Sequence, residues 1–230
     1  MTKQVALVED EAAIRENYSD ALKTQGYEVL SFSDRDSALR VFKQQLPDLA
    51  IIDIGLGEDV EGGFELCREL RGMSSSLPIM FLSARDSDLD TISGLRLGAD
   101  DYLTKDISIA QVLARVTALF RRIEAVHSDT NKDDLHKVGD LIIDVNSMRI
   151  EWKSTRIDLT LTEFWMLYSI AKIPGHVKNR DQLMQDANIF VDDGTVTSHI
   201  KRVRRKFEQA DSGFNNIETI YGMGYRWNKD

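Results

Sequence analysis

The chain has 230 residues, of which 42% are hydrophobic and 29% charged, and its formal net charge at pH 7 is −9. This is the composition of a folded protein with room for two ordinary domains. No apolar run reaches membrane-spanning length and the N-terminus lacks a signal-peptide pattern, so we expect a cytoplasmic location with neither secretion nor a membrane anchor. Because Cys67 is the only cysteine, an internal disulfide and a Cys-rich metal site are excluded.

The first 122 residues alternate between apolar runs and amphipathic segments. The predicted strands are QVALVED, YEVLSF, LAIIDI, PIMFLSA and DYLTK, and the predicted helices cover 12–25, 37–45, 64–72, 89–97 and 109–122. Five strands that alternate with five helices predict an α/β domain with a doubly wound parallel sheet. The third strand is apolar throughout before it reaches Asp53, as expected for a strand buried on both faces.

The alternation stops after residue 122. IEAVHSDTNKDDLHK is polar and aperiodic, which predicts a linker over 123–136. The remainder, 137–230, begins with the short strands LIIDV, RIEW and RIDLT, continues with helices over 162–171, 180–187 and 195–207, and ends with two strands in IETIYGMGYRW. We therefore expect an α+β second domain. Its net charge is also different, because 126–230 carries −1 and 1–125 carries −8, which suggests two separate tasks.

Chemically active side chains fall at the ends of the predicted strands. Glu9 and Asp10 end the first strand, Asp53 the third, Ser83 the fourth and Lys105 the fifth. In a doubly wound sheet, ligands bind beyond the carboxyl ends of the strands. With the strand order 2-1-3-4-5, the first and third strands are neighbours, so three carboxylates are expected to meet beside a hydroxyl and an ammonium group.

Three carboxylates this close repel one another, and a purely oxygen ligand set suits Mg²⁺. A bound cation would screen an incoming phosphoryl group, so that Asp53 could attack phosphorus and form an aspartyl phosphate. Lys105 and Ser83 could each bind a phosphoryl oxygen. Any one of these carboxylates is explained as well by helix capping or by solvation. The five groups together favour phosphorylation of Asp53.

The predicted helix over 195–207 has two faces. Its apolar stripe consists of Val196, Ile200, Val203 and Phe207. The rest of its surface carries hydroxyl and basic side chains, including the cluster KRVRRK at 201–206. Such a face suits the DNA major groove, although by itself it is equally typical of a solvated helix surface.

Several of these motifs occur together in one known family. VEDE, LSAR and GADDYLTK, with Asp53 at the end of the third strand, resemble the flavodoxin-like receiver domain of two-component response regulators. LTEF, NRDQLM, TVTSHIKRVRRKF and IETIYGMGYRW resemble the winged helix-turn-helix output domain of the OmpR/PhoB family. The resemblance covers nearly the whole chain. It implies a transcriptional regulator, not an enzyme, that accepts a phosphoryl group from a histidine kinase, dimerises through its receiver domain and binds double-stranded promoter DNA.

The resemblance also implies individual roles. In the receiver domain these are the phosphoacceptor Asp53, the Mg²⁺ ligands Glu9, Asp10, Asp53 and the Gly55 carbonyl, the switch pair Ser83 and Tyr102, and the phosphoryl-binding Lys105. In the output domain Thr197, Ser198, Lys201 and Arg202 match base-contacting positions, Arg180, His199, Arg204 and Thr219 match phosphate contacts, and Tyr221 lies in the wing. For the dimer, Asp100, Asp101, Arg115 and Arg122 match two salt bridges, whereas Thr91 and Gln111 cannot form the third.

The chain departs from the family pattern in four places. Asp106 stands where relatives have a proline joined by a cis bond to the lysine. The loop GLGEDVEGGF is about two residues longer and more acidic than usual, and its Glu58, Asp59 and Glu61 could tune cation affinity. Tyr221 replaces the arginine that many wings carry. ANIFVDDG is shorter than the loop that contacts RNA polymerase in some relatives and lacks its tryptophan, so that contact stays an open expectation.

Two other interpretations remain open at this point. A haloacid-dehalogenase type phosphohydrolase also uses a strand-end aspartate, but it needs a second acid two residues later, where this chain has Gly55. Turnover of small phosphoesters would reveal it. A DNA-binding protein with a degenerate, unphosphorylated receiver is the second alternative, and labelling with acetyl phosphate and Mg²⁺ distinguishes it.

Overall fold

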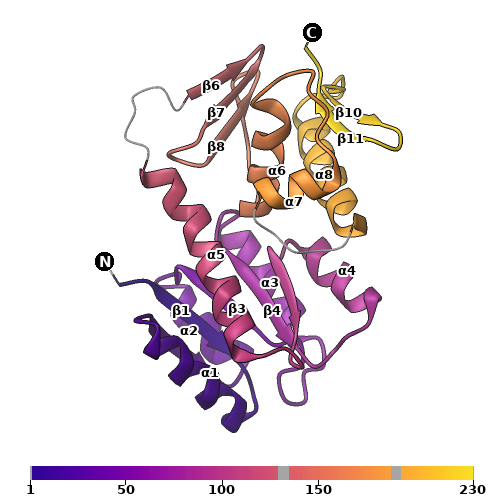
Figure 1. Cartoon of the computed structure of the whole chain (residues 1–230). Helices are drawn as coiled ribbons and strands as arrows, with labels where there is room; N and C mark the ends of the chain where they lie inside the picture. Colours follow the sequence, from indigo (N-terminus) through magenta and orange to yellow (C-terminus); the bar gives the residue numbers. More distant parts are fainter. Residues whose placement is uncertain (1, 129–134, 188–192, 230) are drawn as a thin grey trace. The chain divides into compact units, whose positions relative to one another are not determined.

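The computed structural model describes the backbone of residues 2–128, 135–187 and 193–229, and the side chains of these residues except 122–128 and 193 (Figure 1). The chain divides into two compact units, Met1–Thr117 and Ala118–Asp230. Within the described residues, no helix is both long enough and apolar enough to span a membrane.

The first unit contains a five-stranded sheet. Its strands are β1 (Gln4–Val8), β2 (Glu28–Phe32), β3 (Leu49–Ile52), β4 (Ile79–Ser83) and β5 (Asp101–Thr104). All neighbours are parallel and the order is β2-β1-β3-β4-β5, which confirms the predicted topology. The pairing of Val8 with Ile52 brings the ends of β1 and β3 to the same level.

Helices cover both faces of this sheet (Figure 1). They are α1 (Ala12–Thr24), α2 (Arg35–Phe42), α3 (Gly62–Met73), α4 (Asp88–Leu97) and α5 (Ile109–Ser128). One core joins alternate sheet residues to α2, α3 and α4, with the rings of Phe64 and Phe81 packed edge to face at 5.3 Å. The intervening sheet residues, such as Leu7 and Ile51, are buried as well and face the opposite side.

Several helix ends differ from the sequence prediction, among them the start of α2 and the end of α5. Helix α2 begins at Arg35 rather than at residue 37, because the Asp34 carboxylate accepts a hydrogen bond from the Ser37 amide and caps the helix. Helix α5 continues to Ser128, so 123–128 are helical although they were expected in the linker. Their polar composition is compatible with a helix, because Glu and Ala have high helix propensity.

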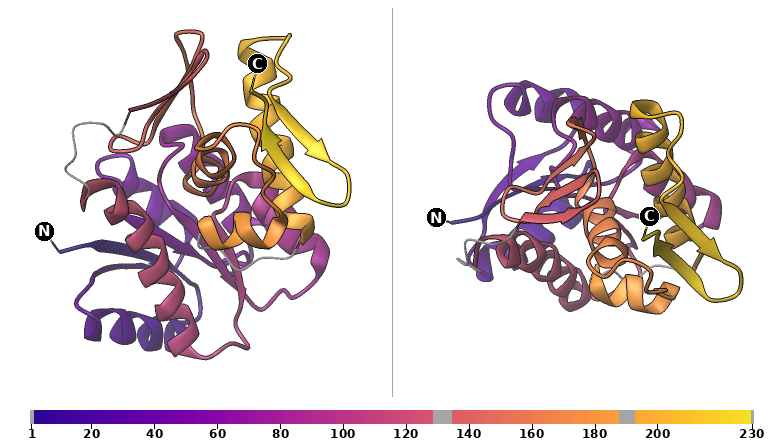
Figure 2. Two further views of the ribbon diagram at one scale, coloured as in Figure 1. Left: turned by 45° about the horizontal axis from the view of Figure 1, so that its top comes forward. Right: turned by 90° about the horizontal axis from the view of Figure 1, so that it is seen from above.

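The second unit opens with an antiparallel sheet of β6 (Leu135–Val138), β7 (Leu141–Asp144), β8 (Arg149–Trp152) and β9 (Thr155–Ile157). Strand β6 was not predicted, since LHKV is short and its side chains are only exposed or half-buried. Helices α6 (Leu161–Ala171), α7 (Arg180–Asp186) and α8 (Asp193–Ala210) follow. Strands β10 (Ile217–Ile220) and β11 (Gly224–Trp227) form a hairpin beside α7 and α8 (Figure 2, yellow).

The core of the second unit is built around α8. Its predicted apolar stripe is fully buried, and Phe207 stacks on Phe214 with ring centroids 4.5 Å apart. The hairpin is joined to the segment before α7 by paired backbone hydrogen bonds between Lys178 and Tyr225.

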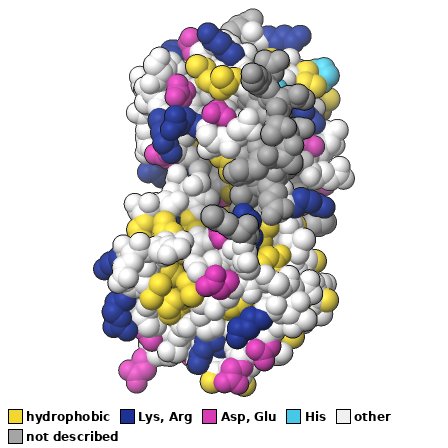
Figure 3. Space-filling model, turned by 90° about the vertical axis from the view of Figure 1, so that its left-hand side faces the viewer, with side chains coloured by type: hydrophobic (Ala, Val, Ile, Leu, Met, Phe, Trp, Pro, Cys, Tyr) yellow, Lys and Arg dark blue, Asp and Glu magenta, His cyan; other side chains and the backbone are white. Residues whose placement is uncertain are grey.

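On the face drawn in Figure 3, basic and acidic side chains are interspersed, so the net charge of −9 does not form one acidic surface there.

Candidate functional site

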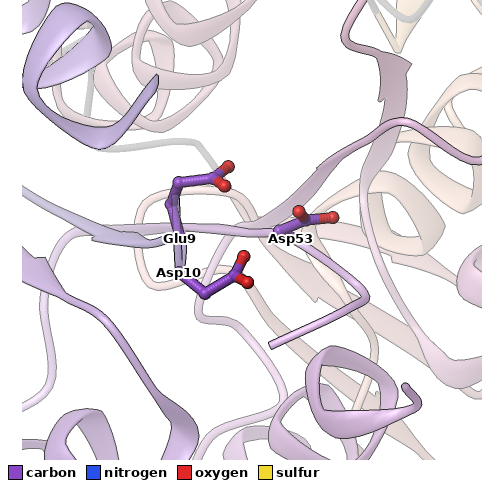
Figure 4. A group of neighbouring side chains, drawn as sticks. All are labelled: Glu9, Asp10 and Asp53. Atoms are coloured by element: carbon purple, nitrogen blue, oxygen red, sulfur yellow. The ribbon is translucent and has the colours of Figure 1, made fainter. Parts of the chain in front are cut away.

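The predicted carboxylates meet at the end of the sheet in the first unit. Glu9 and Asp10 follow β1 and Asp53 follows β3, and Figure 4 shows the three carboxylates grouped beside one another. One ligand oxygen of each lies within 4.8 Å of those of the other two. Glu9 and Asp53 are buried, at 1% and 7% exposure, so their mutual repulsion is poorly screened by water.

Lys105, directly after β5, is the cation of this cluster. Its Nζ lies 2.6 Å from Asp53 Oδ2 and 2.8 Å from Glu9 Oε2. Burial by itself would lower the pKa of Lys105, but hydrogen bonds to Asp53 and Glu9 raise it above its ordinary value. Burial raises the pKa of the Glu9 carboxyl, while the bond to Lys105 opposes that rise.

One ammonium group faces three carboxylates here, so the cluster is short of positive charge. All the side-chain donor atoms that remain for a cation are oxygens, and oxygen ligands suit a small, hard divalent cation. The residues present therefore fit a site for such an ion.

Ser83 and Tyr102 lie on the neighbouring strands β4 and β5. Ser83, the last residue of β4, is 2% exposed. The Tyr102 hydroxyl donates a 2.9 Å hydrogen bond to the backbone carbonyl of Arg85, and the Arg85 amide lies 3.5 Å from the Ser83 hydroxyl. Both side chains thus contact the start of the segment that leads from β4 to α4. Burial raises the pKa of Tyr102 well above its usual range, which keeps the phenol protonated.

The loop between β3 and α3 covers the acidic cluster. The Gly57 amide donates to Asp10 Oδ2 at 3.0 Å. Asp59 pairs with Arg35 at 3.5 Å and Glu61 with Arg85 at 3.1 Å. These two acids of the loop are therefore held by arginines rather than gathered with the carboxylates at the strand ends.

Gly63, in the first turn of α3, shows why glycine is needed where this loop ends. A Cβ atom at this position would lie 2.0 Å from the backbone oxygen of Asp53. The Gly63 amide bonds to Ile54 O at 2.8 Å, which brings the first turn of α3 against the end of β3. Half-buried Gly55 lies in the same loop. The Lys105–Asp106 bond is trans, since the described residues contain no cis peptide bond.

A second group of predicted residues gathers on α8 and the hairpin of the second unit. Thr197 and Lys201 are exposed and Ser198 is half-buried. Arg204 donates to Thr219 Oγ1 at 2.7 Å and to Ile217 O at 3.1 Å. Burial lowers the pKa of Arg204.

The side chain of Tyr225 contacts three of the predicted DNA-binding residues, Arg180, Arg204 and Thr197. The guanidinium carbons of Arg180 and Arg204 lie 5.9 and 5.8 Å from its centroid, and its hydroxyl donates to Thr197 Oγ1 at 3.2 Å. Three residues predicted to contact phosphate, Arg180, Arg204 and Thr219, are thereby brought together. Tyr225 was missed by sequence reasoning, because an aromatic residue in a strand gives no signal beyond burial.

The structure places two other predicted DNA contacts differently. His199 is fully buried, and Arg202 Nη2 lies 2.6 Å from its Nδ1. Arg202 Nε also donates to Glu163 Oε1 at 2.7 Å. Sequence reasoning gave Glu163 no role of its own, although Thr160 followed by Glu163 has the spacing of a helix capping box, which the structure shows at the start of α6.

The tip of the hairpin is exposed. Tyr221 is 99% exposed and Met223 is 61% exposed. Gly222 between them has φ +72°, a conformation that glycine adopts readily. Of the loop ANIFVDDG, residues 188–192 lie outside the described residues, so the expectation about RNA polymerase stays a prediction.

The residues predicted for a dimer interface make contacts within the first unit. Asp100 is fully buried, where it accepts from Arg71 Nη2 at 2.8 Å and from the Ile79 amide at 3.0 Å. Asp101 lies 3.8 Å from Arg115. The side chain of Arg122 lies outside the described residues.

A strand-end carboxylate cluster on a 2-1-3-4-5 sheet, joined in one chain to a helix-hairpin unit with a basic face, defines the class of phosphorylation-switched DNA-binding regulators. Comparison with known proteins agrees with this class. A family model described as response regulator receiver domain matches residues 5–117, and one described as transcriptional regulatory protein, C terminal, matches 154–227.

Whole-chain relatives identify the family. The transcriptional regulatory protein BaeR of Escherichia coli O6:H1 is 36% identical over 100% of this chain and 94% of its own length. CreB of Escherichia coli K12 is 37% identical over 96% of both. DrrB, described as a Thermotoga maritima OmpR/PhoB homolog, superposes with a TM-score of 0.53 at 28% identity, covering 99% of this chain and 100% of DrrB. The chain belongs to the OmpR/PhoB family of two-component response regulators. It is a transcription regulator that binds DNA and works with a histidine kinase, and not an enzyme.

Proposed function

We propose that Asp53 accepts one phosphoryl group from the partner kinase in a Mg²⁺-dependent reaction, and that this controls the binding of promoter DNA in the cytoplasm. The observation that carries the proposal is the meeting of Glu9, Asp10 and Asp53 beyond the ends of the neighbouring strands β1 and β3, with Lys105 from the end of β5 paired with Glu9 and Asp53. The proposed division is a receiver domain over 1–122, a linker over 123–136 and a DNA-binding domain over 137–230.

Glu9, Asp10, Asp53 and the Gly55 carbonyl would hold the Mg²⁺ ion, which supplies positive charge near the phosphoryl oxygens. An oxygen of the Asp53 carboxylate forms the new bond to phosphorus. The phosphorus–nitrogen bond to the donor histidine breaks, and its electron pair stays on the imidazole, which takes up a proton. Lys105 can leave Asp53 to bind a phosphoryl oxygen, and the Ser83 hydroxyl can donate to another.

The test is intact-mass measurement of the full chain after incubation with acetyl phosphate. One added phosphoryl group is expected with Mg²⁺, and none with a chelator. Asp53→Asn, which keeps the shape of the side chain, is the matched control and should remain unlabelled. Equal labelling of this variant would move the phosphoacceptor to another residue, whereas no labelling of the unaltered chain would favour a degenerate receiver.

For DNA we propose that Thr197, Ser198 and Lys201 reach base edges, that Arg180, Arg204 and Thr219 contact backbone phosphates, and that Tyr221 reaches the duplex from the wing. The gathering of two guanidinium groups beside Tyr225 supports the phosphate contacts. Lys201→Ala should relax sequence preference, while Arg204→Ala should weaken specific and random duplexes alike. If both variants lose specific and random binding in the same ratio, this division of roles is wrong.

We further propose a twofold receiver dimer that phosphorylation favours. In it, Asp101 of one subunit pairs with Arg115 of the other, and Asp100 of one subunit pairs with Arg122 of the other. The burial of Asp100 against Arg71 makes the second bridge the weaker one. Both acids are buried and already face an arginine of their own unit, Asp100 with Arg71 and Asp101 with Arg115. Exchanging these contacts between subunits gains little energy, so the dimer should be weak and sensitive to salt. Sedimentation of the full chain with and without beryllofluoride tests this, and a dimer indifferent to Arg115→Ala would place the interface elsewhere.

A further inference from the structure

A buried ion cluster joins helices α6 and α8 in the second unit. The Glu163 side chain is 1% exposed, and its carboxylate meets two cations of α8. Arg202 Nε lies 2.7 Å from Oε1 and Lys206 Nζ lies 2.6 Å from Oε2. Oε2 also accepts a 3.0 Å hydrogen bond from the Thr160 amide at the start of α6. One carboxylate thus caps α6 and anchors two successive turns of α8.

The cluster belongs to a different face of α8 from the exposed basic residues. Arg202 and Lys206 are four residues apart and therefore lie on the same side of the helix, next to the buried stripe that contains Val203 and Phe207. Their side chains are 18% and 30% exposed. Lys201 and Arg205, one residue earlier in each turn, are exposed.

Two of the donor atoms of Arg202 bond to groups within the protein. Its Nε donates a hydrogen bond to Glu163, and its Nη2 donates one to His199 Nδ1 at 2.6 Å. Because arginine has no acceptor atom, His199 Nδ1 must accept in this contact. A swing of Arg202 toward a base would break both contacts and leave Glu163 short of one positive charge inside the protein, and burying an incompletely paired charge is costly.

Resting on the proposed DNA contacts, we propose that Glu163 is a positioning residue for DNA recognition. By holding Arg202 and Lys206, it fixes the rotation of α8 on α6 and so aims Thr197, Ser198 and Lys201. Arg202 supports readout through this contact and does not read a base. The pKa of Glu163 agrees with the arrangement: burial alone would raise it, but the charges of Arg202 and Lys206 lower it to about 2.

The two roles of Arg202 predict opposite results for a conservative substitution. A lysine can keep a charge beside Glu163, but it cannot reproduce the bidentate fork with which arginine recognises a guanine. If Arg202 positions the helix, Arg202→Lys should bind within about threefold of the unaltered chain. If it reads a base, Arg202→Lys should lose roughly tenfold or more of discrimination at one base pair.

The experiment uses the full chain and a duplex that it selects from a randomised pool. Affinities for that duplex, for each of its single base-pair variants and for a random duplex are measured for Glu163→Gln, Arg202→Lys, Arg202→Ala, the Glu163→Gln/Arg202→Ala double variant and the control Lys201→Ala. Circular dichroism at the assay temperature shows which variants are folded. Arg202→Lys alone still decides between the two roles if Glu163→Gln does not fold.

In the positioning role, Glu163→Gln weakens discrimination at every base pair that α8 reads, although Glu163 is too buried to touch DNA. Arg202→Ala gives the same profile, and combining the two adds little further loss because both break one contact. Lys201→Ala instead affects a single base pair.

The proposal is overturned if Glu163→Gln is folded and discriminates among the duplex variants as the unaltered chain does. It is also overturned if Arg202→Lys and Arg202→Ala both lose discrimination at one and the same base pair only. Either result leaves the proposed DNA binding intact. If the unaltered chain selects no duplex at all, the proposed DNA contacts fail and the positioning role fails with them.

Discussion

Lys105 Nζ lies 2.6 Å from Asp53 Oδ2, which ties the end of β5 to the end of β3. The same nitrogen lies 2.8 Å from Glu9 at the end of β1. A single ammonium group therefore links the ends of β1, β3 and β5 at the carboxyl edge of the sheet. It neutralises part of the charge that the incoming phosphoryl group would otherwise meet.

The first prediction follows from this contact. Lys105→Met keeps much of the side-chain volume but removes the charge, so phosphoryl uptake from acetyl phosphate should slow by roughly 10²-fold, as when one electrostatic stabiliser is lost. Intact-mass time courses measure the rate. Lys43→Met, on an exposed side chain, is the control. An unchanged rate in Lys105→Met would show that the contact with Asp53 is structural only.

The second prediction concerns the acid stability of the second unit. In the folded state burial alone would raise the pKa of Glu163, but the charges of Arg202 and Lys206 lower it from its ordinary value of 4.5 to about 2. A lowered carboxyl pKa stabilises the fold above the unfolded value, and this contribution is lost as the pH falls from about 4.5 toward 2.

Tryptophan fluorescence can follow this loss, because Trp152, Trp165 and Trp227 are the only tryptophans and all lie in the second unit. In denaturant titrations Glu163→Gln should be less stable than the unaltered chain above pH 4.5, by roughly 3–5 kcal/mol. The difference should shrink on acidification. A difference that is constant between pH 2 and 6 would contradict the assignment.

The third prediction concerns the loop between β3 and α3. Arg85 donates to the Val60 carbonyl at 2.6 Å and pairs with Glu61 and Asp90. Removing its side chain in Arg85→Ala should raise amide hydrogen exchange in residues 57–61 by about tenfold, since both contacts of Arg85 with the loop are lost and each exposed pair contributes about 0–1 kcal/mol. Glu61→Gln should give a smaller increase. Unchanged exchange in both variants would show that the loop is held by its other contacts, such as Arg35 with Asp59 and the Gly57 amide with Asp10.

The fourth prediction compares two glycines of α3. A Cβ at Gly63 would lie 2.0 Å from Asp53 O, whereas a Cβ at Gly72 would meet nothing within 4 Å. Gly63→Ala should destabilise the first unit by more than about 3 kcal/mol and lower phosphoryl uptake. Gly72→Ala should stabilise it by roughly 0.5–1 kcal/mol. Thermal unfolding followed by circular dichroism measures both, and equal midpoints would contradict the close approach.

The fifth prediction concerns the hairpin tip. Tyr221 is almost fully exposed and has no charge. Tyr221→Arg should therefore raise DNA affinity at low salt and steepen the dependence of log K on log salt by about one, as one added phosphate contact does. Met223→Ala should leave this slope unchanged. If Tyr221→Arg also leaves it unchanged, the tip lies away from the duplex.

The sequence by itself determined the order of strands and helices in the first unit and the group of carboxylates at the strand ends. Both are consequences of local patterns. Alternating apolar runs identify each element, and parallel strands place their carboxyl ends on one edge, where Glu9, Asp10 and Asp53 meet. The apolar stripe of α8 was predictable for the same reason, since helical periodicity shows which side is buried.

Only the tertiary structure decided which long-range partner each charge has. Arg202 is paired with Glu163, 39 residues away, and Asp100 with Arg71, 29 residues away. Strand β6 likewise depends on its pairing with β7. Periodicity fixes the face on which a side chain lies, but the partner of a charge depends on how separate elements pack. A buried charge must be compensated, and the residues that compensate it come together only when the chain has folded.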